Sequence, residues 1–543
     1  MRCSPALASL ISSGGIVFEA QANVDQPLRR SDQLDVANMT QNSKRTPFAG
    51  RVLMLGCGSV GQCTLPLVHR HLDMPADRIT VLDFDDVRPK IEGPLQAGVV
   101  FRQARLTQDN YATLLGELAG PGDIIIDLSW NVETFDLLAW CSEHEVRYLN
   151  TSLEEWDPYG DIENKSPYER SLYSRQMRIR QLKSRLNSRS KPSPTAIMDH
   201  GANPGLVSHF TKRALLEIAS SMLEKGLPAA TAVNRAAFEK LVANAAGEGE
   251  GSFARLSQAT GTKVVHISER DTQVSSRPKA MNEFVNTWSI EGFFEEGTAP
   301  AELGWGTHER RLPKHAHVPI GGPLNQIFLA QPGIRTYVHS WVPAGGPIIG
   351  MVVRHAESFT ISDHLTVWEE AIEGRRAVYR PTVHYAYMPC DNAILSLYEL
   401  TMHNFQLQPK LRIMADEITD GMDELGVLIM GHGLTTWWTG SQLDIHEARR
   451  LVPGQNATTL QVAAAVLGGL VYMIGNPCKG ILVPDELPHK EVLDVAGSYL
   501  GPCPSVQTNW TPLESRSRLF AKWGAPPVDE ADLWQFASFA VEP

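Results

Sequence analysis

The chain has 543 residues, of which 43% are hydrophobic and 20% are charged, and this composition is ordinary for a globular protein of two or three domains. Its formal net charge of −12 argues against nucleic acid as the main partner, because nucleic-acid-binding surfaces are basic. The longest apolar stretch, 462–474, falls short of a membrane span and predicts a buried helix, so we expect no membrane partner. Seven scattered cysteines without a C-x-x-C pair favour a reducing, cytoplasmic compartment.

The N-terminal segment differs from the rest of the chain. Residues 1–48 are rich in Ser, Asn and Gln and predict a mostly disordered extension. Their apolar part lacks the basic start of a signal peptide, and Asp25, Asp32 and Asp35 count against an organelle transit peptide. We therefore expect the first folded domain to begin near residue 49.

A glycine-rich turn follows the first predicted strand. Residues 51–55 are a short apolar run of the kind buried in a parallel sheet, and 59–72 predict a helix. Between them stand Gly56, Gly58 and Gly61 at the spacing G-x-G-x-x-G. In a dinucleotide-binding fold, the first glycine permits the turn, the second lets the pyrophosphate approach, and the third lets the helix pack on the strand.

An acidic residue lies near the end of the second predicted strand, 79–86. Asp83 follows Gly61 by about 20 residues, the distance at which dinucleotide-binding folds place the acid that binds the adenosine ribose. A carboxylate there repels a 2′-phosphate, so the predicted cofactor is NAD rather than NADP. The backbone of Ser59 and Val60, at the helix N-terminus, is expected to face the phosphates. A glycine-rich turn without a ligand is the alternative.

Strands and helices continue to alternate along the first domain. This order predicts a doubly wound parallel sheet of the Rossmann type over residues 49–200. Ligands of such sheets lie past the carboxyl ends of the strands, so Ser129, Asn131, Asn150 and Thr151 are expected to border the nucleotide cleft. The predicted strands are 99–106, 123–129 and 146–152, and the predicted helices are 109–119 and 132–144.

A basic segment then leads into the second region. Residues 169–194 predict a mostly helical stretch whose arginines form a solvated face, and the sequence SKPSP marks a domain transition. Residues 195–210 predict a strand, a turn and a helix. From the residues alone, Asn203 is best interpreted as the N-cap of that helix.

Acids beside aromatic residues mark the second region. A predicted strand, 264–273, carries Glu269, and the strand-like run 283–297 carries Trp288 and Glu296. A buried carboxylate needs a partner, and either an arginine or a cationic ligand would serve. Tryptophan is the ring best suited to cation–π contact. The H-x-H spacing at His315 and His317 lacks further ligands, so no metal site is predicted.

Longer motifs over both regions resemble those of the homospermidine synthase family, in the saccharopine-dehydrogenase-like group. They include GCGSVGQCTLPL, HGANPGLVSHF, HISERDTQ, NTWSIEGF, PAELGWGTHE, YRPTVHYAY, GSQLDIHEAR and YLGPC, and the resemblance runs from about residue 50 to 537. It implies an NAD-dependent enzyme that oxidises an amine of putrescine to an imine. The imine exchanges with the amine of a second putrescine and releases ammonia, and hydride then returns, without net redox change. The resemblance also implies that spermidine can serve as donor and that the chain forms a homodimer.

The resemblance assigns roles to particular positions. The substrate tryptophan of the family falls on Trp288, and its anchoring carboxylates fall on Glu269 and Glu296. Catalytic pocket positions fall on Asn203 and His355. Substrate-contacting positions fall on Glu154, Pro204 and Asn131.

One position departs from the family pattern. Where the family typically has S-V-D after the fourth strand, this chain reads SWN, which places Asn131 at the aspartate position. An amide cannot supply the charge, although Glu133 can compensate if the loop turns it inward. Two alternatives remain open, namely a carboxyspermidine synthase or saccharopine-type reductase that consumes reduced nicotinamide, and a catalytically inactive NAD-binding scaffold.

The expected architecture is therefore an α/β protein with two main parts. A mixed α/β domain for substrate binding and dimerisation covers 201–543 and follows the NAD-binding domain. The apolar helix near 457–474 is expected to pack back on the first domain.

Overall fold

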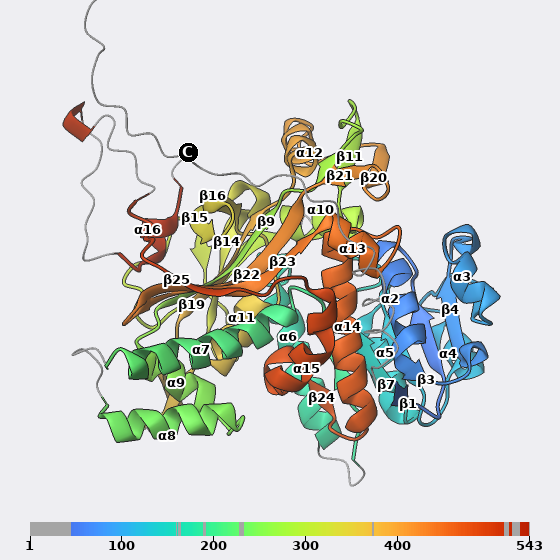
Figure 1. Ribbon diagram of the computed structural model, residues 1–543, viewed down its shortest axis with the longest axis horizontal. Helices are drawn as coiled ribbons and strands as arrows, with labels where there is room; N and C mark the ends of the chain where they lie inside the picture. Colours follow the sequence, from blue (N-terminus) through green and yellow to red (C-terminus); the bar gives the residue numbers. More distant parts are fainter. Residues whose placement is uncertain are drawn as a thin grey trace, which may run out of the picture. The chain divides into compact units, whose positions relative to one another are not determined.

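The computed structural model describes residues 45–158, 160, 164–187, 192–226, 233–371, 374–514, 521–523 and 533–541 (Figure 1). Most of the predicted extension, 1–44, lies outside this range. At its end, strand β1 (Thr46–Pro47) pairs with β3 (Leu72–Asp73), and Phe48 is buried. The folded chain therefore begins before the predicted boundary at residue 49.

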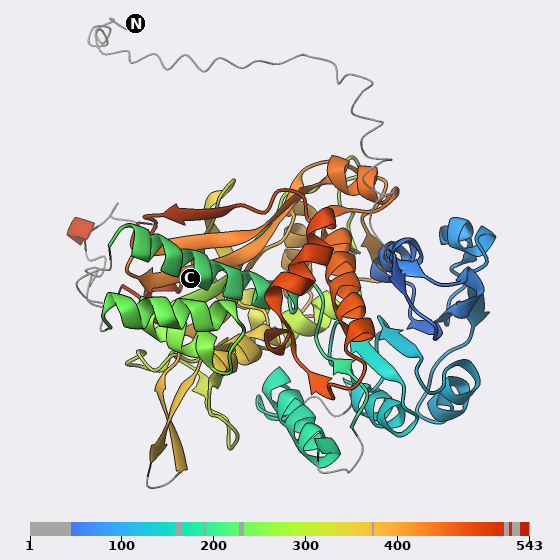
Figure 2. The ribbon, with the colours of Figure 1, turned by 60° about the horizontal axis from the view of Figure 1, so that its bottom comes forward.

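The first sheet has seven parallel strands in the order β24-β8-β7-β6-β2-β4-β5 (Figures 1 and 2). The strand order reverses between β2 and β6, and at such a switch point the carboxyl ends of the strands open a crevice for a ligand. This arrangement confirms the predicted Rossmann-type fold. The strands are β2 (Val52–Leu55), β4 (Ile79–Asp83), β5 (Val100–Gln103), β6 (Ile124–Asp127), β7 (Arg147–Asn150), β8 (Ala196–Ile197) and β24 (Ile481–Leu482).

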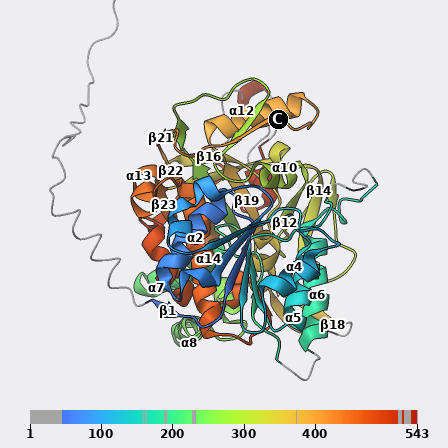
Figure 3. The same cartoon turned by 90° about the vertical axis from the view of Figure 1, so that its right-hand side faces the viewer.

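Helices cover both faces of this sheet, which is why its strands are continuous apolar runs. Val52 and Met54 point to the face covered by α2 and α14, and Leu53 and Leu55 point to the face covered by α4, α5 and α6 (Figure 3). The helices are α2 (Ser59–His71), α4 (Tyr111–Leu118), α5 (Thr134–Glu143), α6 (Leu172–Asn187) and α14 (Ala457–Gly475), with the short α3 (Glu92–Gln96) beyond β4.

Helix α14 comes from the C-terminal part of the chain but belongs to the core of the first domain. Val466, Leu470 and Met473 pack in one cluster with residues of β2 and α2. Among the described residues, α14 is the helix with enough length and apolar character to cross a membrane, whereas we expected none from the sequence. Because 78% of its apolar window is buried inside the protein, its composition is explained by the core.

The basic helix α6 connects the two domains. We predicted that its arginines form a solvated face, and this is wrong for Arg175, which is 7% exposed and pairs with Glu155 and Glu295. Arg178 lies over the ring of Phe135 of the first domain. The helix therefore holds the domains together through side chains that the charge pattern alone assigns to solvent.

The second domain is built on a ten-stranded mixed sheet with the central order β13-β14-β12-β19-β9-β22-β23-β25. Helix α7 (Leu206–Glu224) packs on β22 and β23, and α8 (Arg235–Ala246) and α9 (Ser252–Thr260) lie beyond it (Figure 1). The strands are β9 (Val264–Asp271), β12 (Pro300–Gly304), β13 (Ala316–His317), β14 (Gln326–Pro332), β15 (Tyr337–Val342), β16 (Gly346–Met351), β19 (Thr382–Met388), β22 (Met422–His432), β23 (Thr435–Asp444) and β25 (Ser505–Thr508). Further elements are α11 (Glu357–His364), α13 (Ile445–Leu451), α15 (His489–Ala496), α16 (Phe536–Phe539), and the hairpin of β17 (Val367–Ala371) and β18 (Gly374–Tyr379).

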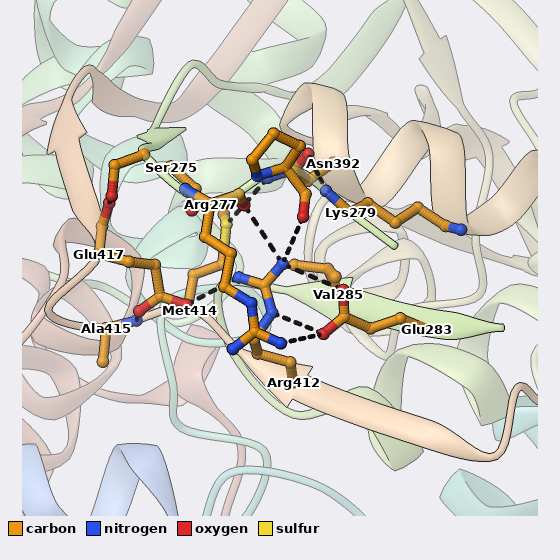
Figure 4. A network of polar contacts seen from close by, with 12 residues as sticks. Ser275, Arg277, Lys279, Glu283, Val285, Asn392, Arg412, Met414, Ala415 and Glu417 are labelled. Carbon is orange, nitrogen blue, oxygen red and sulfur yellow. Dashed lines mark hydrogen bonds and ion pairs between the residues drawn. The ribbon is translucent and has the colours of Figure 1, made fainter. Parts of the chain in front are cut away.

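A small lobe extends from this domain. It contains the parallel pair β11 (Glu283–Asn286) and β20 (Lys410–Ile413), the helix α12 (Asp391–Met402), and the pair β10 (Val274–Ser275) and β21 (Ile418–Asp420). Glu283 accepts hydrogen bonds from Arg277 at 3.0 Å and from Arg412 Nε at 2.8 Å, and Arg412 also reaches Glu417 (Figure 4). These contacts join the lobe's separate chain segments into one unit.

Candidate active site

A cavity of about 180 Å³ lies at the carboxyl edge of the first sheet, and residues of the second domain line its other side. Side chains from both domains line it, which places the predicted cofactor-binding edge against the predicted amine-binding residues. The predicted residues that line it are Val60, Ser129, Thr151, Glu154, Asn203, Pro204, Glu269, Trp288, Glu296 and His355.

Two predicted border residues do not line the cavity. Asn150 is 1% exposed, and its side chain bonds Ser152 O at 2.6 Å and Asp199 N at 2.9 Å, so it fixes the ends of β7 and β8 to each other. Asn131 is held with φ 57° by the loop, and its Oδ1 is buried without a partner among the described residues. Trp130 lines the cavity instead.

Glu133, the possible substitute for the missing aspartate, does not line the described part of the cavity either. Glu133 pairs with Arg178 of α6 at 2.6 Å. It therefore stabilises the contact between α5 and α6, and among the described residues it does not line the cavity. The acid on this side of the cavity is Glu154, whose Oε2 lies 3.5 Å from Asn131 N.

The glycine-rich turn has the geometry that a dinucleotide requires. A Cβ at Gly56 (φ 77°) would lie 2.7 Å from Leu128 O, and one at Gly61 would lie 2.7 Å from Gly56 O. At Gly58, by contrast, no described atom outside the glycine and its two chain neighbours lies within 4 Å of the Cβ position. Since no described side chain caps α2 either, its N-terminus is open to a phosphate, and the residues present fit NAD.

Asp83 holds the turn in place. Its Oδ2 accepts a hydrogen bond from Cys57 N at 2.6 Å, and its Oδ1 accepts one from Asp85 N at 2.9 Å. Each carboxylate oxygen has a second lone pair for a ribose hydroxyl. The acid therefore connects the end of β4 to the turn after β2, and the role toward the ribose stays a prediction.

Glu269 lies at the centre of a hydrogen-bond network. Its Oε2 accepts from Asn203 Nδ2 at 2.9 Å and from the hydroxyl of Tyr385 on the neighbouring strand β19. Asn203 is therefore not the predicted N-cap, and α7 begins after Gly205. Burial raises the pKa of Glu269 to about 8, although both hydrogen bonds favour its ionised form.

The run 283–297, which we predicted to be strand-like, changes structure in the middle. Strand β11 ends at Asn286, and helix α10 (Ile290–Thr298) begins after Ser289, whose side chain accepts a hydrogen bond from Gly292 N. Trp288 lies just before this helix, and its ring is 5.7 Å from that of Phe293. The indole and the acids of α10 thereby reach the same cavity.

Neighbouring acids of α10 have different partners. Glu295 is bound by Arg175, at 3.0 Å, and by Arg354. Burial acts to raise its pKa, but the two guanidinium groups prevail and lower it. Glu295 is therefore paired with arginines, which was one of the two explanations that the sequence left open for buried acids in this region.

Glu296 binds a histidine instead. His355 Nε2 lies 3.0 Å from Glu296 Oε2, and its Nδ1 lies 3.1 Å from Glu357 Oε1. Burial alone would lower the pKa of His355, but the two carboxylates raise it well above its ordinary value. The two acids thus favour the protonated form of this ring, which makes it a weaker base than an ordinary histidine.

Two further acids line the cavity. Burial, reinforced by Glu295, raises the pKa of Glu154 to about 7. Asp199, which follows β8, accepts from Gln176 at 2.8 Å, and burial together with Glu357 raises its pKa to about 7. Acids that titrate near neutral pH are suited to exchanging protons with amines.

The sequence interpretation missed several residues of the cavity. The signal for Asp199 was present, since it is an acid directly after a predicted strand, at the edge where ligands bind. Arg175 and Arg354 reach the site only through tertiary packing. The missed lining residues include Trp130, Arg175, Asp199, Glu295, Arg354 and Tyr385. Among the described residues, no three His, Cys, Asp or Glu side chains are grouped as metal ligands.

Comparison with known proteins gives the same picture of two domains. Residues 52–197 match the saccharopine dehydrogenase NADP binding domain family, and residues 201–502 match the saccharopine dehydrogenase C-terminal domain family. A nicotinamide dinucleotide is therefore the cofactor class of this chain. The family description names NADP, whereas the acid at position 83 favours NAD.

Individual relatives are similar over almost their whole length. The homospermidine synthase of Blastochloris viridis is 42% identical over 497 residues, which cover 91% of this chain and 97% of the relative. That of Mesorhizobium japonicum is 39% identical over 501 residues, with the same coverage. The crystal structure of the Legionella pneumophila homospermidine synthase in complex with NAD superposes with a TM-score of 0.78 and 36% identity, and covers 92% of this chain and 100% of that one. This chain therefore belongs to the homospermidine synthase family.

Proposed function

We propose that the protein is an NAD-dependent aminobutyl transferase that joins two putrescines, or spermidine and putrescine, into homospermidine. The supporting observation is the cavity itself, where an indole and carboxylates from the second domain face the carboxyl edge of a nucleotide-binding sheet. A doubly charged amine needs this kind of surface, because acids and aromatic faces attract cations. Bound NAD would supply the hydride chemistry, accepting hydride from the carbon beside an amine and returning it to an imine.

The first domain holds the cofactor in this proposal. The open backbone at Gly58 and the N-terminus of α2 bind the pyrophosphate, while Asp83 binds the adenosine ribose. Ser129 and Thr151, at the ends of neighbouring strands, lie where the nicotinamide half would enter the cavity. Residues of the second domain line the other side of the cavity and reduce its contact with water, which slows hydrolysis of an imine.

The second domain binds and deprotonates the amines. Trp288 stabilises the iminium carbon and nitrogen through cation–π attraction, worth about 2 kcal/mol in a desolvated site. Glu269 is the proposed base that takes a proton from the attacking amine, because its raised pKa is close to the working pH. His355 orients the carboxylate of Glu296, and Glu296 then anchors a terminal ammonium. Asn203 fixes the carboxylate of Glu269.

Incubation of the purified protein with NAD and putrescine tests this function. Homospermidine and ammonia are expected in equal amounts, with all nicotinamide recovered as NAD. Net consumption of reduced nicotinamide would instead support a saccharopine-type or carboxyspermidine-type reductase. Firmly bound NAD without any product would support an inactive scaffold. Release of diaminopropane from spermidine would identify spermidine as a donor.

The second part of the proposal is a homodimer. The outer face of α12 exposes Leu395, Tyr398 and Met402 at helical spacing, and Met281 is also exposed on the same lobe. A second copy of the chain can cover such a face around a two-fold axis, because the same helix then packs against itself. Light scattering after size exclusion should give a dimer for the parent and a monomer for Tyr398→Glu. A dimeric variant would refute this surface.

The third part of the proposal is that the protein resides in a reducing compartment. The described cysteines, namely Cys57, Cys63, Cys141, Cys390, Cys478 and Cys503, are free of disulfides. A cytoplasmic location agrees with this chemistry. Thiol titration of protein taken directly from its native cells is expected to find these cysteines reduced.

A further inference from the structure

Trp130 is a cavity residue to which the sequence interpretation gave no role. It follows the carboxyl end of β6 and lines the same cavity as Trp288 and Glu154. The side chain keeps 42% of its surface exposed, in contrast to the buried core of the first domain. An indole left open in a ligand cavity offers its π-face to a ligand.

The loop that carries Trp130 is tethered on both sides. Before it, Ser129 N donates to Asp127 Oδ1 at 3.1 Å. After it, Asn131 has φ 57°, and Thr134 N donates to Glu154 O at 3.1 Å. The backbone on both sides of Trp130 is therefore held in place, so the point from which the indole extends into the cavity is set before a ligand binds.

The cavity's acids are already engaged. All five carboxylates of the cavity have protein partners: Glu269, Glu295 and Glu296 bind Asn203, Arg175 and His355, while Glu154 and Asp199 accept hydrogen bonds from Ser152 and Gln176. The pKa values of Glu154 and Asp199 are also raised to about 7, chiefly by burial. A reaction between two diamines brings up to four amino groups into this space. Recognition of the second diamine therefore needs a surface that attracts cations without carrying a charge.

We propose that Trp130 is a second cation-binding ring of the active site, which receives an ammonium group of the second diamine while Trp288 faces the reacting carbon. The inference deepens the proposed function and rests on it, because only a reaction with two amines needs both rings. The proposal also explains how an amine can be attracted to this side of the cavity, where the neighbouring Asn131 carries no charge and Glu133 is paired with Arg178. Trp130 is thus a specificity-determining residue for the amine acceptor.

The test separates amine binding from cofactor binding. Putrescine affinity is measured by calorimetry on NAD-loaded protein, alongside product formation and the NAD content of the purified protein. Trp130→Leu keeps an apolar wall but removes the ring, and we expect the KM for putrescine to rise about tenfold, with kcat and NAD content unchanged. Trp130→Phe should fall between the leucine variant and the parent. Fluorinated tryptophans placed at position 130 should weaken binding progressively, because fluorine reduces the negative charge of the ring face.

Trp523→Leu is the matched control, since Trp523 is 85% exposed and lies outside the cavity. It should leave every measured quantity unchanged. Loss of NAD with unchanged putrescine affinity in Trp130→Leu would show that the ring packs on the cofactor and would overturn the proposal. Unchanged affinity for both ligands would overturn it as well. If the parent binds putrescine but forms no homospermidine, the proposed function fails, while the affinity of Trp130→Leu still decides the role of the ring.

Discussion

Glu295 and Glu296 are sequence neighbours on α10 whose carboxylates have opposite surroundings. Glu295 is bound by Arg175 and Arg354, whereas Glu296 binds the imidazole of His355 at 3.0 Å. Consecutive helical residues point about 100° apart, so Glu295 reaches the two arginines and Glu296 reaches the histidine, although both line the cavity. One acid is therefore suited to a structural role, and its neighbour is suited to binding substrate.

This difference predicts different consequences for two equivalent substitutions. Glu295→Gln leaves two buried guanidinium groups without their anion and should destabilise the protein by about 3 kcal/mol. Glu296→Gln should leave the melting temperature nearly unchanged and lower kcat/KM for putrescine by at least about 100-fold. Thermal unfolding and steady-state kinetics of both variants check this. Equal melting temperatures for the two would contradict the structural role of Glu295.

Activity should depend on the ionisation of Glu269. Burial raises its pKa to about 8, so at pH 7 the carboxyl is mostly protonated and cannot accept a proton from an amine. We expect kcat/KM for putrescine to rise with pH until it levels off above about pH 8. Tyr385→Phe removes a hydrogen bond that favours the ionised form, and it should move this rise about one pH unit higher. A pH profile that Tyr385→Phe does not shift would exclude Glu269 as the base.

Trp288→Phe tests the stabilisation of the iminium carbon. The smaller ring keeps an apolar surface but has a weaker negative face, so kcat should fall about tenfold or more. NAD should remain bound, because the first domain holds it. Product formation and the absorbance of the bound nucleotide measure the two effects. A variant with full activity would remove the cation–π role.

Cofactor preference should depend on Asp83. Asp83→Asn removes the charge that repels a 2′-phosphate and disturbs the hydrogen bond to Cys57 N. We expect NAD affinity to fall about tenfold and the preference for NAD over NADP to shrink. Dissociation constants for both nucleotides, measured by calorimetry, give the answer. Retention of the parental preference would assign the discrimination to another residue.

The lobe around Glu283 should lose stability in acid. Hydrogen bonds, chiefly from Arg412, lower the pKa of Glu283 to about 2, below its ordinary value of 4.5. The stabilisation is therefore complete above pH 4.5 and is lost as the pH falls toward 2. The difference in unfolding free energy between the parent and Glu283→Gln should be largest at neutral pH and shrink below pH 4.5. Urea titrations at several pH values measure it.

Much of the first domain could be predicted because local patterns determine it. The strand residues of β2 are apolar on both faces, and the spacing of the glycines in the following turn can be recognised within a few residues, although the atom that excludes a side chain at Gly56 is Leu128 O, just after β6. The position of Asp83 at the end of the second strand of the sequence pattern, β4, follows from the same pattern. These features are visible in short segments of the sequence, and the fold of the first domain could therefore be predicted from them.

The site could be predicted only in part, because its details depend on contacts between residues that are distant in the sequence. The run containing Trp288 and Glu296 alternates like a strand, yet Ser289 caps a helix there, and the helix decides which acid meets the arginines and which meets His355. Asn150 looked like a border residue because it ends a strand, but its side chain turns into the protein. Arg175 looked like a solvent residue because it lies in a basic run. Each difference depends on a partner that is far away in the sequence.

The position of α14 has a consequence for the order in which the chain can fold during synthesis. One face of the first sheet is completed only by helix α14, residues 457–475. One of the two edge strands of this sheet, β24, comes later still, at residues 481–482. The nascent polypeptide therefore leaves the ribosome with the apolar face around Val52 and Met54 only partly covered, by α2, until nearly the last tenth has been translated. Chaperones that bind exposed apolar segments should thus remain on this protein until its synthesis is almost complete.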